Sequence, residues 1–146
     1  MRVQVQEAAF DLGAETARFS SGCRASGAIV TFTGVVRDVA GGLERMEIEH
    51  YPGMTQSALQ DIAAEAVTRW TLEDALVIHR YGALRTGEMI MMVATAAPHR
   101  ADAFEAAQFL MDYLKSRAPF WKREVTAQGA AWVAAKTEDE DALKRW

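Results

Sequence analysis

Apolar and polar residues alternate in several segments of the chain, and each such segment predicts a β-strand. Residues 2–8 and 43–51 alternate, and residues 27–38 are rich in β-branched side chains. Residues 38–45 contain two adjacent glycines and predict a flexible loop. The strand over 43–51 has one face that meets water. One face carries Met46, Ile48 and His50, and the other carries Glu47, Glu49 and Tyr51.

Helical spacing appears first in two segments of the N-terminal half. Residues 11–23 predict a weak helix that stops at a Ser-Ser-Gly sequence. Pro52 and Gly53 then break the chain, and Thr55 is predicted to cap the start of a second helix. The apolar residues of this second helix form one continuous face. They are Ala58, Leu59, Ile62, Ala63, Ala66, Val67 and Trp70.

A third helix is predicted from Pro98 to about Arg117, and Pro119 stops it. Two stripes with 3-4-3 spacing follow its length on different sides. The apolar stripe is Phe104, Ala107, Met111 and Leu114, and the polar stripe is Glu105, Gln108, Asp112 and Lys115.

The remaining apolar segments predict hairpins, and the charged tail, residues 136–146, predicts a short helix or disorder. The predicted strands lie at residues 75–84 and 88–97, joined by Arg85-Thr86-Gly87 in the core, and at 120–125 and 130–135, joined through Gln128-Gly129. No repeat or linker interrupts the chain. We therefore expect a single domain over residues 1–146, of α+β class with mostly antiparallel sheet.

The composition excludes several classes of protein. The 146 residues carry a net charge of -4, which argues against bulk affinity for nucleic acid. The single cysteine, Cys23, has no internal disulfide partner, as is usual in a reducing compartment. The N-terminus lacks the apolar core of a signal peptide, and no apolar run reaches membrane length. We expect a cytoplasmic protein that binds neither nucleic acid nor a membrane.

Cationic side chains surround a Pro-Phe-Trp sequence in the stretch KSRAPFWKRE, residues 115–124. The position of Lys115 allows two interpretations. It forms a surface ion pair with Asp112, or it shares a pocket with Lys122. Lys122 is either an exposed strand residue or the second member of that pair. Two ammonium groups in one pocket lower each other's pKa. A lysine with a lowered pKa can serve as proton donor, base or nucleophile near neutral pH.

Two other positions suit a phosphate group, although a solvated arginine explains each of them as well. His99 and Arg100 follow Pro98 at the predicted start of a helix, where backbone N–H groups and the helix dipole favour an anion. Arg37 ends a predicted strand beside Gly34. The histidines show no metal-ligand spacing, and no nucleotide-binding fingerprint is present. We expect no metal and no cofactor.

Several long strings resemble the large, catalytic subunit of molybdopterin synthase. They are FTGVVRD, EHYPGMT, APHRADAFEAAQFLMDYLKSRAPFWKRE and the terminal KRW, in order from about Gly27 to the C-terminus. The resemblance implies an α/β hammerhead-type fold with a barrel-like part. It also implies a sulfurtransferase of molybdenum cofactor biosynthesis. Such an enzyme converts cyclic pyranopterin monophosphate (precursor Z) to molybdopterin by forming its dithiolene.

The resemblance also implies two kinds of partner. Sulfur arrives as a thiocarboxylate on the C-terminal glycine of a small, ubiquitin-like sulfur-carrier subunit, whose tail enters a pocket of the large subunit. The large subunit forms a homodimer with one small subunit at each end, which makes a heterotetramer.

Carried over residue by residue, the resemblance implies that Lys115 and Lys122 are catalytic. Lys115 would lie nearest the partner's terminal carbonyl, and Lys122 would position the pterin. Arg37, His99 and Arg100 would hold the phosphate, the last two across the dimer. The implied substrate-binding set is Val35, Val36, Arg37, His99, Arg100, Lys115, Lys122, Arg123 and Glu124.

Phe120 and Trp121 are expected to support the wall of this pocket. Two other functions stay open on the residues alone. Cys23 would carry persulfide in a different kind of sulfurtransferase. Alternatively, the basic corner would hold an acidic or glycine-terminated partner tail without catalysing a reaction.

Overall fold

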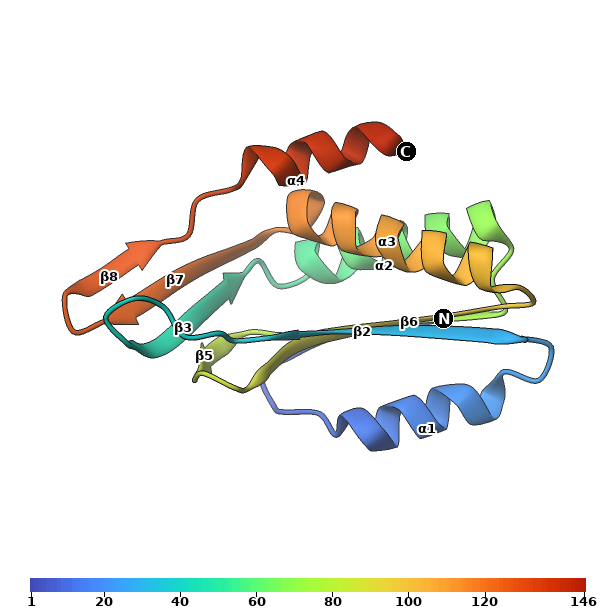
Figure 1. Cartoon of the computed structure of the whole chain (residues 1–146), viewed down its shortest axis with the longest axis horizontal. Coiled ribbons are helices and arrows are strands. Elements are labelled where there is room, and N and C mark those ends of the chain that lie inside the picture. Colours follow the sequence, from blue (N-terminus) through green and yellow to red (C-terminus); the bar gives the residue numbers. More distant parts are fainter.

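The computed structural model describes residues 1–146 and contains two open β-sheets with four α-helices (Figure 1). In chain order the elements are β1 (Arg2–Gln6), α1 (Leu12–Gly22), β2 (Ala28–Val35), β3 (Leu43–His50), α2 (Met54–Trp70), β4 (Asp74–Arg80), β5 (Gly82–Leu84), β6 (Met89–Ala97), α3 (Arg100–Arg117), β7 (Phe120–Thr126), β8 (Gly129–Trp132), α4 (Thr137–Ala142) and a final 3-10 turn (Leu143–Arg145). The predicted α+β class is confirmed. Neither sheet closes on itself, so the expected barrel-like part is minor.

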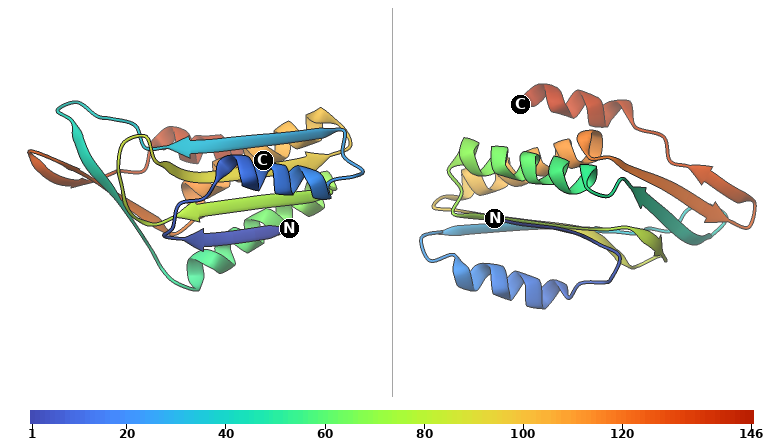
Figure 2. Two further views of the ribbon diagram at one scale, coloured as in Figure 1. Left: turned by 90° about the horizontal axis from the view of Figure 1, so that it is seen from below. Right: turned by 180° about the vertical axis from the view of Figure 1, so that it is seen from behind.

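The first sheet has the strand order β1-β4-β6-β2. Only the β1–β4 pair is parallel, and the other two pairs are antiparallel. Helices α2 and α3 cover one face of this sheet, and α1 covers the other (Figures 1 and 2). Because both faces are covered, β4 and β6 are buried along nearly their whole length, as their apolar sequences predict.

Two apolar clusters lie on the two faces of the first sheet. The larger cluster packs α2 and α3 against the sheet, and the smaller one packs Phe19 of α1 and Cys23, the residue after α1, against its other face. Strand β4 serves both clusters because alternate side chains point to opposite faces. Ala75 and Val77 join the larger cluster, while Leu76 and Ile78 join the smaller one.

The second sheet is entirely antiparallel, with the order β5-β3-β7-β8. The sequence predicts one strand over residues 75–84, but the chain bends after Arg80. Gly82 adopts a φ of +95°, and the next residues pair with β3 instead of β6. The expected core hairpin is therefore formed by β4 and β6, and β5 carries the chain into the second sheet.

The start of α2 differs from the prediction. Gly53, not Thr55, occupies the N-cap position, and Thr55 lies fully buried in the first turn. Its hydroxyl accepts a hydrogen bond from the Tyr51 backbone N–H at 3.2 Å and donates to the Pro119 carbonyl at 3.4 Å. Thr55 therefore connects the end of β3 to the segment between α3 and β7.

Helix α3 ends at Arg117 as predicted but begins at Arg100, two residues after the predicted start, and its buried face is rotated from the predicted apolar stripe. Phe104 is 60% exposed, whereas Phe109 and Leu110 are fully buried. Asp112, predicted on a polar surface, is buried. Its carboxylate accepts from the Trp146 indole N–H at 2.7 Å and pairs with Arg145 at 3.1 Å. These partners belong to the charged tail, whose position the local spacing of α3 does not reveal.

The tail forms α4 and a 3-10 turn, and the C-terminal Trp146 ends against α2 and α3. Its ring packs edge-on against Trp70 and Phe109, with centroids 5.4 and 5.7 Å away. The side chain of Arg69 donates to the Trp146 carbonyl at 3.1 Å. None of the helices is both long enough and apolar enough to span a membrane.

Candidate active site

Lys115 and Lys122 lie on either side of a sharp change of direction. Pro119 cannot continue a helix and disfavours helical backbone at Ala118, which is extended with φ −79° and ψ 132°. Helix α3 therefore ends at Arg117, and β7 begins at Phe120. Lys115 lies in the last turn of α3, and Lys122 is the third residue of β7.

Lys122 lies on the inner face of the second sheet. It is directly opposite Ile48 in the β3–β7 register, and Ile48 belongs to the larger apolar cluster. Residues directly opposite in an antiparallel pair share a face, so the Lys122 side chain extends toward the same interior. The reading of Lys122 as an exposed strand residue is therefore wrong, because the side chain is half-buried.

The positive charge of Lys115 acts on the amine of Lys122. Burial lowers the pKa of the Lys122 amine from its usual value, and the positive charge of Lys115 lowers it further. Asp139 of α4 acts in the opposite direction. Neither amine forms an ion pair, since Asp112, the predicted surface partner of Lys115, is paired with Arg145 instead. The arrangement concentrates positive charge without a paired carboxylate, and such a site attracts an anion.

Aromatic side chains form the inner wall next to Lys122. Phe120 stacks on the His79 ring, with centroids 3.7 Å apart and planes at 15°. His50 packs against Tyr81 at 4.3 Å and lies 6.2 Å from Phe120. Trp121, by contrast, points to the opposite face of the strand, where it meets Tyr51 edge-on at 4.7 Å. Of the two aromatic residues expected in the pocket wall, Phe120 lies on the lysine side and Trp121 does not.

His79 is a core residue of the apolar strand β4. It is 5% exposed, and its Nδ1 contacts the Arg80 carbonyl at 2.8 Å. Burial lowers the pKa of His79 to about 3, and the charge of Lys122 acts in the same direction. The sequence analysis does not predict that His79 and His50 lie beside Lys122. Alternation in residues 43–51 already places His50 on the inner face, but the contact of β4 with β7 is long-range.

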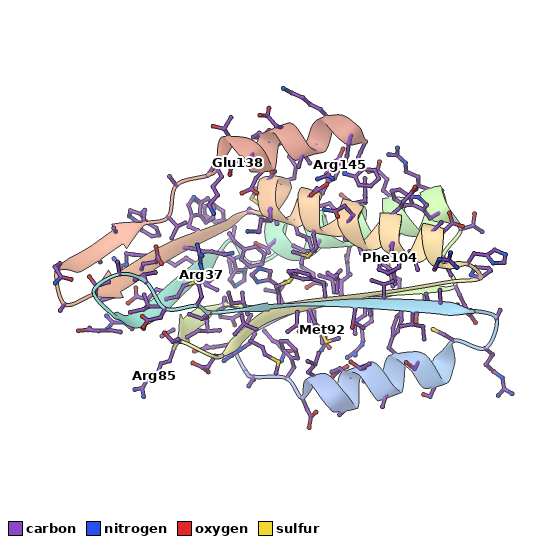
Figure 3. The ribbon with its side chains drawn as sticks, viewed as in Figure 1. Arg37, Arg85, Met92, Phe104, Glu138 and Arg145 are labelled. Atoms are coloured by element: carbon purple, nitrogen blue, oxygen red, sulfur yellow. The ribbon has the colours of Figure 1, made fainter.

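The last residue of β2 and the two residues after it divide between surface and core. Val35 and Arg37 are exposed, and Arg37 forms no ion pair. Figure 3 shows Arg37 in the left part of the molecule, on the side of the C-terminal end of α3. Val36 is 1% exposed, and its backbone N–H and carbonyl bond to Glu88 and Gly87. In this structure Val36 offers no free group to a ligand, unlike its two neighbours.

His99 and Arg100 lie at the other end of α3, far from the lysines of the same chain. Both are exposed, and His99 is the N-cap residue in an extended conformation. Arg100 precedes Lys115 by 15 residues of continuous helix. At 1.5 Å per residue this corresponds to about 22 Å along the axis. One copy of the chain therefore does not bring His99 and Arg100 to the lysine site.

Arg123 and Glu124 occupy opposite faces of β7. Arg123 pairs with the Glu47 carboxylate on the outer face, and its guanidinium lies 5.4 Å from the ring of Trp132. This pairing holds the pKa of Glu47 below its usual range, together with Arg45. Glu124 lies opposite Met46 on the face of Lys122. The structure thus brings Glu124 to the lysine side and engages Arg123 elsewhere.

Comparison with known proteins identifies the family of this chain. A model of the family described as "MoaE protein" matches residues 5–117. The molybdopterin synthase catalytic subunit of Cereibacter sphaeroides is 68% identical over 146 residues, and the match covers 100% of both chains. The chain belongs to the MoaE protein family. The resemblance found in the sequence is confirmed.

Solved structures of similar proteins agree with this MoaE assignment. The molybdopterin biosynthesis MoaE protein of Burkholderia ambifaria has a TM-score of 0.85 at 49% identity, covering 99% of this chain and 96% of that one. A protein–protein complex of subunits 1 and 2 of the molybdopterin-converting factor from Helicobacter pylori has a TM-score of 0.76, covering 92% of this chain and 91% of that one. At 17% identity the second similarity supports the fold alone.

Proposed function

We propose that the chain is the catalytic subunit of a molybdopterin synthase. It transfers sulfur from the C-terminal thiocarboxylate of a small ubiquitin-like subunit to cyclic pyranopterin monophosphate, which forms the dithiolene of molybdopterin. The observation that carries the proposal is the unpaired, half-buried amine of Lys122 with the charge of Lys115 beside it. Both the thiocarboxylate and the substrate phosphate are anions, and a cationic site holds two anions close despite their repulsion.

The two lysines have different surroundings, which supports different roles. Lys115 is exposed at the end of α3, so it meets the incoming tail first and polarises the acyl carbonyl or transfers protons as sulfur attacks. Lys122 is half-buried against the aromatic wall, where it stabilises intermediates and positions the pterin. Val35 and Glu124 complete the substrate-binding set on this side.

Arg37, His99 and Arg100 hold the substrate phosphate. Because about 22 Å of helix separates Arg100 from Lys115, a homodimer must supply His99 and Arg100 from its other copy. A small subunit at each end of this homodimer gives a heterotetramer. The reaction requires reduced sulfur, which fits a cytoplasmic location.

Reconstitution tests this function directly. The chain is mixed with thiocarboxylated small subunit and cyclic pyranopterin monophosphate, and molybdopterin is measured by the fluorescence of its oxidised derivative. Lys115→Ala is expected to lower turnover about a hundredfold or more and to leave affinity for the small subunit nearly unchanged. Lys144→Ala is the matched control, because Lys144 is exposed and pairs only with Asp141. A binding module without catalysis would give no molybdopterin with any of these variants.

The rival role for Cys23 has little physical support. The thiol is buried under α1, and burial followed by the charge of Asp74 raises its pKa above the usual value. A raised pKa keeps the sulfur as a weakly nucleophilic thiol. Cys23→Ala is therefore expected to keep full turnover with thiocarboxylated partner, and a dead variant would favour a persulfide mechanism.

A further inference from the structure

His50 lies beside Lys122 on the second sheet and has no role in the reaction described so far. It is directly opposite Phe120 in the β3–β7 register, and Ile48, two residues before it, is directly opposite Lys122. Residues two apart on a strand share a face, so His50 and Lys122 are diagonal neighbours on the inner face. Such neighbours lie about 7–8 Å apart, within reach of a long side chain. His50 therefore belongs to the wall from which the Lys122 side chain extends.

Aromatic contacts hold the imidazole of His50 in place. Its ring centroid lies 4.3 Å from that of Tyr81 and 6.2 Å from that of Phe120, with planes at 39° in both pairs. Burial lowers the pKa of His79 to about 3, and Lys122 and His50 both act in the same direction. These side chains are therefore close enough to interact around the Phe120 ring. A ring restrained in this way presents its nitrogens in fixed directions.

The two ring nitrogens of His50 have different surroundings. Nδ1 is buried without a hydrogen-bond partner, whereas Nε2 is not buried in this way and makes no hydrogen bond within the chain. A proton on Nδ1 would be a buried donor without an acceptor, and such donors are rarer in proteins than buried acceptors without a donor. We therefore expect the ring proton on Nε2, where it can be donated to a molecule that enters the site.

We propose that His50 is a further substrate-binding residue, whose Nε2–H donates a hydrogen bond to an acceptor atom of the pterin ring. A pterin carries a carbonyl oxygen and unprotonated ring nitrogens, and its planar ring fits a wall of aromatic side chains such as Phe120 and Tyr81. The half-buried position of His50 favours this ring over the substrate phosphate, because the proposed phosphate ligand Arg37 is exposed. The inference rests on the proposed function for the identity of the substrate.

Ring 15N spectra of the wild-type protein test the expected tautomer, because the chain contains only three histidines: His50, His79 and His99. Nuclear Overhauser contacts with the Tyr81 ring assign the signals of His50. His79 is an internal reference, since its Nδ1 lies 2.8 Å from the Arg80 carbonyl, which only accepts, and so carries the proton. His50 should show the opposite tautomer. A proton on Nδ1 of His50 would overturn the proposal, and this measurement needs no variant to fold.

The same spectra test the ligand. Cyclic pyranopterin monophosphate should shift the Nε2 signal of His50, whereas inorganic phosphate should leave it unchanged. A shift with phosphate alone would make His50 a phosphate ligand and overturn the assignment to the pterin ring. A shift with the thiocarboxylated small subunit, without one for the pterin, would assign His50 to the partner tail and overturn it as well.

Two variants separate the hydrogen bond from packing. His50→Phe keeps a ring against Tyr81 and removes the donor, and His50→Gln places an amide donor near the position of Nε2. His50→Phe should raise the KM for the pterin about tenfold, with kcat and the affinity for the small subunit retained, because the bond is made equally in the bound substrate and the transition state. His50→Gln should recover most of that loss. An unchanged KM in His50→Phe, or equal losses in the two variants, would overturn the proposal.

The two levels of inference fail in different ways. If the wild type formed no molybdopterin, the proposed function would fail, whereas the 15N shift of His50 on addition of the pterin would still decide the binding role. A wild type that forms molybdopterin without any change at His50 would overturn this inference alone.

Discussion

The position of Lys122 lowers the stability of the fold. Its amine has lost water on the inner face of the second sheet and has gained no carboxylate partner. Stability-optimised interiors pair or avoid such charges. An unpaired cation beside a second cation is therefore a functional feature, and its removal should affect stability and activity in opposite directions.

Lys122→Met tests this opposition. The folded-state pKa of Lys122 lies below the value of 10.5 expected for the unfolded chain. Protonation thus opposes folding at neutral pH, and the penalty disappears as pH rises from the folded pKa through 10.5. Denaturation at pH 7 should show Lys122→Met more stable than wild type, by on the order of 1 kcal/mol after solvent screening. At strongly alkaline pH the difference should vanish, while molybdopterin formation is lost at every pH.

A less stable Lys122→Met at pH 7 would contradict this account. Lys136→Met serves as the control, because Lys136 is exposed and no carboxylate pairs with it. Its stability should match that of the wild type at both pH values.

Residue-level prediction from sequence succeeds where the signal is local. The seven-residue separation of Lys115 and Lys122, with Pro119 between them, already predicts a turn that brings both amines to one place. The surroundings of Lys122 are not predictable in this way. They depend on His79 from β4 and on Asp139 from α4, both distant along the chain.

At the scale of elements, the turn between α3 and β7 is held by a contact from α2. The buried Thr55 hydroxyl bonds to Tyr51 and to Pro119, so it joins three elements at the point from which both lysines extend. The sequence predicts Thr55 as a helix cap, which is the common use of threonine near Pro-Gly. The true role requires the position of Pro119, 64 residues away.

Thr55→Val is expected to lower the free energy of unfolding by about 1–3 kcal/mol, because the Tyr51 N–H loses its acceptor in a partly buried place and the Pro119 carbonyl loses its donor. Valine keeps the size and branching of threonine, so packing is conserved. Thr55→Ser retains the hydroxyl and should recover most of the stability. Urea denaturation measures both, and equal losses in the two variants would assign the effect to packing instead.

A second contact between elements fixes the start of α3. A Cβ on Gly27 would lie 2.6 Å from the Pro98 carbonyl oxygen, which is backbone and cannot rotate away. Gly27→Ala should therefore destabilise the fold by roughly 1–3 kcal/mol and displace the His99–Arg100 turn. Gly22→Ala is the matched control, since nothing lies within 4 Å of the added atom. Thermal unfolding of the two variants separates the clash from a general effect of alanine.

Most helices and strands are predicted correctly from the sequence, and the exceptions have physical causes. The apolar face of α2 is as predicted, because a single 3.6-residue period determines it. The predicted strand over 75–84 is broken because Gly82 allows a backbone that local pattern does not reveal. Asp112 of α3 is buried, contrary to the prediction, because Trp146 and Arg145, from the tail, satisfy its carboxylate.

At the scale of the whole molecule, the cationic residues separate into two groups at opposite ends of α3. Lys115 and Lys122 lie at its C-terminal end, and His99 and Arg100 at its start. The proposed function assigns all four to one site, whereas a single copy keeps them about 22 Å apart along the helix. The proposed site therefore needs residues from two copies of the chain.

Mixed dimers test this requirement. Lys122→Ala and Arg100→Ala chains should each be nearly inactive alone. After unfolding and refolding together at equal amounts, half of the dimers contain both chains, and one of their two sites has every residue intact. Activity should return to about one quarter of the wild-type value per chain. Mixtures that stay inactive, although exchange of subunits is demonstrated, would contradict a site shared between copies.

The four tryptophans form two pairs, one in the helical layer and one on the second sheet. Trp70 and Trp146 are packed around Phe109, while Trp121 and Trp132 stand on the outer surface of the second sheet, 42% and 56% exposed. Acrylamide will quench the emission of the outer pair and spare that of the inner pair. Unlabelled protein thus carries two optical reporters, one for events near β7 and β8 and one for melting of the helical layer.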